Sequence, residues 1–69
     1  MPKFQVRDES RSLAFYDAES AASALTKFAE DEARAAAKLA LSVAVSEMTV
    51  SGDEATTTID GRRHYARPV

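Results

Sequence analysis

The residues best suited to chemistry lie in the last segment of the sequence, "IDGRRHYARPV" (residues 59–69). Its final eight residues contain three arginines, one histidine and one tyrosine: Arg62, Arg63, His64, Tyr65 and Arg67. A guanidinium group can hold a phosphate or a carboxylate through two parallel hydrogen bonds, and a tyrosine ring can stack on a nucleobase. The segment therefore predicts either a surface that binds an anionic partner or the polar edge strand of a sheet.

Alternation divides the basic residues of this segment between two faces. Successive side chains of a strand point to opposite faces, so Arg62 and His64 are expected on one side. The other side would carry an arginine–aromatic–arginine stripe, formed by Arg63, Tyr65 and Arg67. A second set, Arg7 and Arg11, would add to this stripe if the first strand lay beside the last, which the sequence leaves open.

Three consecutive acidic residues form a separate candidate for partner contact: Glu30, Asp31 and Glu32. Because consecutive residues wrap around a helix, these side chains are not expected on one stripe. We expect a solvated helix turn in which Arg34 or Lys38 pairs with an acid. The alternative is an acidic patch that imitates a nucleic-acid backbone or meets a basic partner.

Catalytic and cofactor-binding motifs are missing from the sequence. The two glycines, Gly52 and Gly61, do not form a phosphate-binding loop, and neither HExxH nor GxSxG occurs. The chain has no cysteine and one histidine, which excludes thiolate and histidine-rich metal sites. His64 is expected beside Thr57 in a hairpin, where we expect no pocket. We therefore expect a protein that is not an enzyme and that uses no cofactor.

Two short segments near the start of the chain predict a hairpin. Residues 3–7 ("KFQVR") and 12–16 ("SLAFY") alternate polar and apolar side chains, which is the period of a half-buried strand. Residues 8–11 ("DESR") form the turn between them, of a type that the sequence leaves open. The apolar pairs expected to share a face of their own strand are Phe4 with Val6 and Leu13 with Phe15.

Residues 17–40 are rich in alanine and predict a helix. Asp17 is the expected N-cap, and Leu25 and Phe28 are expected to pack on the sheet. The end of the helix is not marked by glycine or proline. From Leu39 the spacing of apolar residues changes to two, which predicts a strand over residues 41–50 with a bulge near Glu47. The competing interpretation is one helix over residues 18–47.

The strongest local signal is the dipeptide Asp60-Gly61, which suits a type I′ hairpin turn. It follows the threonine-rich strand "ATTTI" (55–59), which comes after the turn "SGDE" (51–54). The predicted pairs are Ile59 with Arg62, Thr58 with Arg63, Thr57 with His64 and Thr56 with Tyr65.

The predicted order is β-β-α-β-β-β, an antiparallel sheet with one helix on one face, in a single α+β domain over residues 1–69. The uncovered sheet face, or the surface of the helix, is where a partner or a second copy would dock. A chain of 69 residues buries only about 60% of its unfolded surface, and without disulfides we expect a homodimer. The absence of cysteine suits a reducing cytoplasm, and we expect neither a secretory signal nor a membrane span.

The order of elements resembles that of small phage-encoded anti-CRISPR proteins, some of which end in a segment like "TTIDGRRHYA". This resemblance covers the order of elements over most of the chain. It implies an inhibitor that binds a host surveillance complex.

We therefore predict a non-enzymatic interaction protein whose partner is a host protein or a ribonucleoprotein. The alternatives are a small nucleic-acid-binding domain, against which the net charge of −2 argues, and a homodimeric accessory module.

Overall fold

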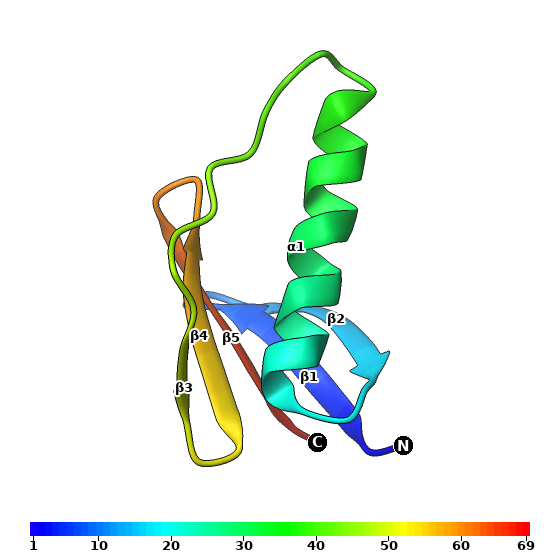
Figure 1. Cartoon of the computed structure of the whole chain (residues 1–69), viewed down its shortest axis with the longest axis vertical. Coiled ribbons are helices and arrows are strands. Elements are labelled where there is room, and N and C mark those ends of the chain that lie inside the picture. The colour runs from blue at the N-terminus through cyan, green and yellow to red at the C-terminus, as the bar shows by residue number, and fades with distance from the viewer.

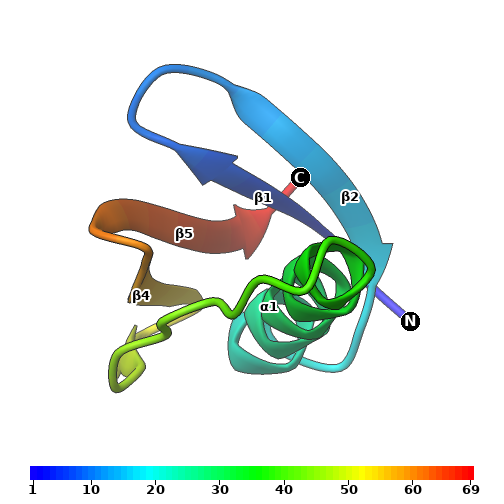
Figure 2. The same cartoon turned by 90° about the horizontal axis from the view of Figure 1, so that it is seen from above.

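The computed structural model describes all 69 residues and contains five strands and one helix. The elements are β1 (Lys3–Asp8), β2 (Ser12–Asp17), α1 (Ala21–Ala37), β3 (Thr49–Ser51), β4 (Glu54–Ile59) and β5 (Arg62–Pro68). All neighbouring strands pair antiparallel, in the spatial order β2-β1-β5-β4-β3. The sheet curves around α1, which covers one of its faces (Figures 1 and 2). The predicted α+β class and element order are confirmed. The length and composition of α1 do not suit a membrane-spanning helix.

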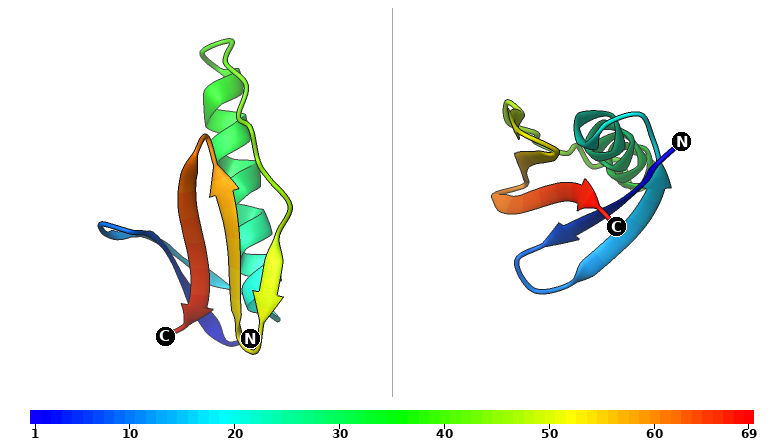
Figure 3. Two further views of the ribbon diagram at one scale, coloured as in Figure 1. Left: turned by 90° about the vertical axis from the view of Figure 1, so that its left-hand side faces the viewer. Right: turned by 90° about the horizontal axis from the view of Figure 1, so that it is seen from below.

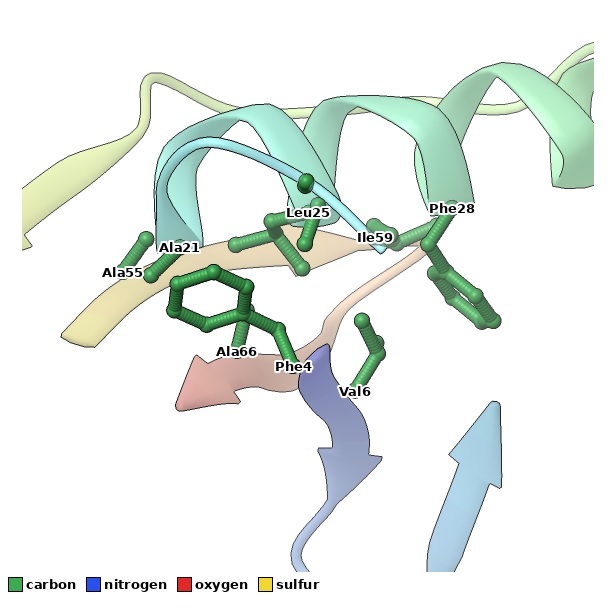
Figure 4. Close-up of a cluster of buried hydrophobic side chains, with 10 residues drawn as sticks. Phe4, Val6, Ala21, Leu25, Phe28, Ala55, Ile59 and Ala66 are labelled. Carbon is green, nitrogen blue, oxygen red and sulfur yellow. The ribbon is translucent and has the colours of Figure 1, made fainter. Parts of the chain in front are cut away.

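The hydrophobic core lies between the first half of α1 and the inner face of the sheet (Figure 4). Leu25 and Phe28 are buried there, as the helical spacing predicts, and Val6 of β1 is fully buried opposite them. Half of the ten core residues are alanines: Ala18, Ala21, Ala24, Ala55 and Ala66. These small side chains leave little bulk between helix and sheet, so the few large ones carry most of the hydrophobic stabilisation, about 1.5–3 kcal/mol for each buried side chain.

The start of α1 differs from the prediction. Ser20, not Asp17, is the N-cap, and its hydroxyl oxygen accepts a hydrogen bond of 3.1 Å from the backbone N–H of Ser23. Asp17 is instead the last residue of β2, where it pairs with Lys3. The chain needs the intervening residues to pass from the sheet to the helix layer, which moves the cap three positions along.

The end of α1 is made without glycine. The helix ends at Ala37, and Ala40 takes a positive φ of 59°. The N–H groups of Leu41 and Ala40 donate to the carbonyl oxygens of Ala36 and Ala37, both at 3.0 Å. This is the hydrogen-bond pattern of a Schellman motif, in which glycine usually holds the position of Ala40. The single helix over residues 18–47 is therefore wrong.

Most of the predicted strand over residues 41–50 is also wrong. Only Thr49–Ser51 form β3, and Val45 makes one isolated bridge with Ile59. The segment 41–48, which we call the strap, runs from the projecting end of α1 back along β4 (Figure 3). Side chains supply two of the hydrogen bonds that hold its backbone: the Asp60 carboxylate accepts from the N–H of Ala44 (2.9 Å), and the Thr57 hydroxyl donates to the carbonyl of Ser46 (2.7 Å). Two more join backbone groups, from the N–H of Ser46 to the carbonyl of Thr58 (2.9 Å) and from the N–H of Asp60 to the carbonyl of Ala44 (2.8 Å). These bonds replace a regular ladder.

The closing hairpin follows the prediction. Asp60 and Gly61 both have positive φ, 50° and 81°, as a type I′ turn requires. All four predicted pairs between β4 and β5 are present. The alternation along β5 is therefore fixed, with His64 and Ala66 facing the helix.

Candidate binding surface on the open face of the sheet

The face of the sheet that turns away from α1 collects the predicted arginine–aromatic–arginine stripe. We call it the open face, and its residues are Lys3, Gln5, Arg7, Phe15, Asp17, Thr49, Glu54, Thr56, Thr58, Arg63, Tyr65 and Arg67. Its central strand is β5, on which Arg63, Tyr65 and Arg67 alternate with the buried His64 and Ala66.

The pairing of β1 with β5 settles whether Arg7 belongs to this surface. Arg7 lies directly opposite Tyr65, and Gln5 lies opposite Arg67. Because paired residues point to the same face, the guanidinium of Arg7 joins the stripe beside the tyrosine ring. The first and last strands of the chain together build the surface, so no single segment of the sequence contains it.

Phe15 is a residue of this surface that the sequence pattern placed incorrectly. It lies opposite Gln5 on the open face and is 55% exposed, although it was expected to share a face with Leu13. A register shift between Val6 and Arg7 disturbs the alternation of β2, so Leu13 packs partly against the core while Phe15 points outward. A pairing of Val6 with Ala14 would have predicted that Phe15 lies on the open face. This pairing requires a bulge in β2, which the sequence does not mark.

The arginines of the open face lack partners within the chain. The single ion pair of the structure joins Arg34 to Asp31 on α1, at 3.0 Å. Arg7 donates only to the backbone carbonyl of Asp8 (3.3 Å), and Arg63 and Arg67 make no side-chain hydrogen bond. Such guanidinium groups keep their donors available for an incoming phosphate or carboxylate.

Two acids lie on this face beside basic residues without neutralising it. Asp17 lies opposite Lys3 at one corner, and by continuation of the β4–β5 register Glu54 lies opposite Arg67. Both acids are exposed, and neither forms an ion pair. The open face therefore presents four basic groups, two aromatic rings and a row of threonine hydroxyls. At one end of it, Arg63 lines a polar hollow of about 330 Å³ together with Asp8, Glu9, Ser10, Gly61 and Arg62. This arrangement suits the binding of an extended anionic partner.

Arg11 and Arg62 do not join the open face. They line a hollow of about 290 Å³ where the β1–β2 and β4–β5 turns meet beneath α1. Other residues around this hollow are Asp8, Phe28, Glu32, Asp60 and His64. The expectation that no pocket lies near His64 is thus wrong, because Phe28 and Glu32 of α1, which extends past the β4–β5 turn (Figure 1), form one wall of the hollow.

His64 nevertheless lacks the partners that catalysis needs. It is 7% exposed, and its Nδ1 donates to the carbonyl of Arg62 at 2.8 Å. Its ring lies 5.5 Å from that of Phe28, at an angle of 34°. Thr57 is the cross-strand neighbour of His64, and its hydroxyl already donates a hydrogen bond to the carbonyl of Ser46. His64 therefore packs the end of the core rather than forming a nucleophile–base pair.

Asp8 organises the turn between β1 and β2, the type of which the sequence left open. Its Oδ1 accepts from the N–H of Ser10 (2.8 Å), the hydroxyl of Ser10 (2.9 Å) and the N–H of Arg11 (2.9 Å). These bonds, above all the one from the backbone of Ser10, lower the pKa of Asp8 from 3.8 to about 2. A carboxylate held in this way stabilises a turn and is too weak a base for proton transfer near neutral pH.

The three helix acids are spread rather than gathered into one patch. Asp31 accepts from the hydroxyl of Tyr16 (2.8 Å) and pairs with Arg34, which confirms the expected helix turn. Partial burial and the bond to Asp31 raise the pKa of Tyr16 to about 12. Glu30 is exposed, and Glu32 lines the hollow.

Comparisons with protein-family models, with curated proteins and with solved structures return no match to this chain. The resemblance to anti-CRISPR proteins stays a prediction. The fold and the open face together define an α+β domain with one uncovered, basic and aromatic sheet face, and its function has to be argued from that face.

Proposed function

We propose that this chain is a non-enzymatic binding protein that occupies a surface of another macromolecule with its open face. One observation carries the proposal: the β1–β5 pairing gathers the unpaired Arg7, Arg63 and Arg67 around Tyr65 on a sheet face that nothing in the chain covers. Arginine and tyrosine are the side chains that most often dominate the energy of binding surfaces.

The rigidity of the open face favours binding. Three neighbouring strands fix the backbone of its side chains, so little backbone entropy is lost when a partner docks. The charge of the face selects an anionic surface on the partner. A host protein or a ribonucleoprotein complex with such a surface is the partner that we expect, and covering that surface would inhibit it.

The proposal is tested by capture from a bacterial lysate with the immobilised protein, with and without nuclease. The test variant carries Arg63→Ala and Arg67→Ala. The matched control carries Arg34→Ala and Lys38→Ala, which removes the same charge from the helix. We expect the wild type and the control to retain the same component and the test variant to lose it, since a central anchor contributes about 2 kcal/mol, or about 30-fold in affinity.

Retention of the same component by all three proteins would remove the open face from the interface. A component that survives nuclease identifies a protein or ribonucleoprotein partner, whereas one that disappears identifies free nucleic acid. If nothing is retained and the mass rises with concentration, the chain is a homodimeric module instead.

A further inference from the structure

We propose that the anionic partner of the open face is single-stranded nucleic acid, bound through phosphate contacts to the arginines and through base stacking on Phe15 and Tyr65. This inference rests on the proposed function and narrows its partner to nucleic acid, either free or exposed on a ribonucleoprotein, instead of a host protein. It is carried by the placement of two aromatic rings among unpaired guanidinium groups on one face.

The positions of the basic groups suit a chain of phosphates. Arg63 and Arg67 are four residues apart on β5, which separates their Cα atoms by about 13 Å. Arg7 lies on the adjacent strand, about 5 Å to the side and level with Tyr65. The three groups therefore flank the tyrosine ring on three sides, where an extended strand can offer successive phosphates while one base reaches the ring.

The aromatic residues distinguish nucleic acid from an acidic protein surface. Phe15 has no polar atom and is 55% exposed on a face otherwise made of charged and hydroxyl groups. Phosphates or carboxylates give this ring no favourable contact, whereas a nucleobase offers a π-face whatever the sequence. Phe15 lies two strands away from Tyr65, about 10 Å across the sheet, so two separate bases can stack.

A double helix does not fit the same features. Its bases are stacked on one another and expose only their edges in the grooves, so neither ring could stack on them. The half-buried hydroxyls of Thr56 and Thr58, beside Tyr65 and Arg63, can bond to sugars or base edges without selecting one base. We therefore expect binding that tolerates sequence and prefers single strands.

The negative net charge of the chain is compatible with this partner because four basic groups outnumber two acids on the open face, and most other acids lie elsewhere. Glu30, Asp31 and Glu32 lie on α1, on the opposite side of the sheet from Arg63 and Arg67. A polyanion is repelled from the helix layer and attracted to the open face, which fixes the orientation in which it docks.

The test measures fluorescence anisotropy of labelled probes of about ten nucleotides, a length within the range of known single-strand sites. The probes are oligo-dT, oligo-rU, an abasic strand with the same number of phosphates, a duplex, and polyglutamate as an acidic polypeptide. Phe15→Thr removes one ring and Phe15→Tyr preserves it. Leu39→Thr is the control, because Leu39 is an exposed apolar residue (72%) outside the open face.

Three phosphate contacts predict a slope of about −2 for log affinity against log salt, which is a loss of about 20-fold between about 50 and about 200 mM salt. Phe15→Thr should weaken oligo-dT binding about 10-fold at an unchanged slope, while Phe15→Tyr and Leu39→Thr should bind like the wild type. Replacing Arg63 and Arg67 by alanine should make the slope shallower by about 1.4.

Three results overturn the inference. In the first, the abasic strand or polyglutamate binds as tightly as oligo-dT, and Arg63→Ala/Arg67→Ala weakens the binding of each probe. The open face then recognises anions in general, and the proposed function stands without nucleic acid as its partner. Tighter binding of the duplex than of the single strand has the same meaning. If oligo-dT binding is unchanged by both the arginine and the Phe15 substitutions, the open face is not the nucleic-acid site, and the capture experiment alone then decides the proposed function.

Discussion

Ala40 ends the helix in a conformation that alanine adopts at a cost, so glycine at this position should stabilise the protein. The φ of 59° brings the Cβ of Ala40 close to its neighbouring carbonyl, a strain of about 1–2 kcal/mol that glycine lacks. Part of this gain is offset, because glycine loses more conformational entropy on folding. We expect Ala40→Gly to raise the free energy of unfolding by about 1 kcal/mol, and the melting temperature by about 4–8 °C.

The assay is urea denaturation followed by circular dichroism, and the control is Ala37→Gly. Ala37 is the last residue of α1, where glycine should lower the free energy of unfolding by about 0.5–1 kcal/mol. The two substitutions are chemically identical and lie three residues apart, so opposite signs can come only from the local backbone. A loss of stability in Ala40→Gly comparable to that in Ala37→Gly would refute the proposed helix stop.

Two further predictions concern the perturbed ionisable groups. Tyr16→Phe should lower the free energy of unfolding by about 1 kcal/mol through loss of the hydrogen bond to Asp31. The pKa of Tyr16 is raised to about 12 in the folded protein, so this difference in stability should be present below about pH 10 and fade as the pH approaches 12. A pH-independent difference would contradict it. Asp8→Asn should destabilise the protein above about pH 4, where the carboxylate is charged in both states, and the difference should shrink as the pH falls towards 2. Denaturation of wild type and Asp8→Asn at pH 2, 3, 4 and 7 checks this, and equal stability at pH 7 would show that the turn does not need the carboxylate.

The parts of the fold that follow from short-range rules could be predicted from the sequence. Asp60-Gly61 specifies its turn because few other dipeptides tolerate positive φ at both positions, and the turn then fixes the register of β4 and β5. The faces of Arg63, Tyr65 and Arg67 follow directly from that register.

The remaining features depend on contacts between distant segments. The position of Arg7 beside Tyr65 needs the β1–β5 pairing, which no local signal specifies. The strap has the alternation of a strand, but the side chains of Asp60 and Thr57 take up two of its backbone groups, and its pairing with β4 is limited to one bridge. Phe15 faces outward because of a register shift in β1–β2, which a two-residue period cannot reveal.

The central claim, that the open face is the binding surface, is tested most directly by NMR titration of the isotope-labelled protein with oligo-dT. The side-chain Nε–H signals of Arg7, Arg63 and Arg67 report on the open face, and that of Arg34 reports on the helix. We expect the signals of Arg7, Arg63 and Arg67 to shift together with the backbone amides around Tyr65 and Phe15, while the signal of Arg34 stays in place. Shifts confined to α1 or to the hollow around His64, with the three arginine signals unchanged, would contradict it.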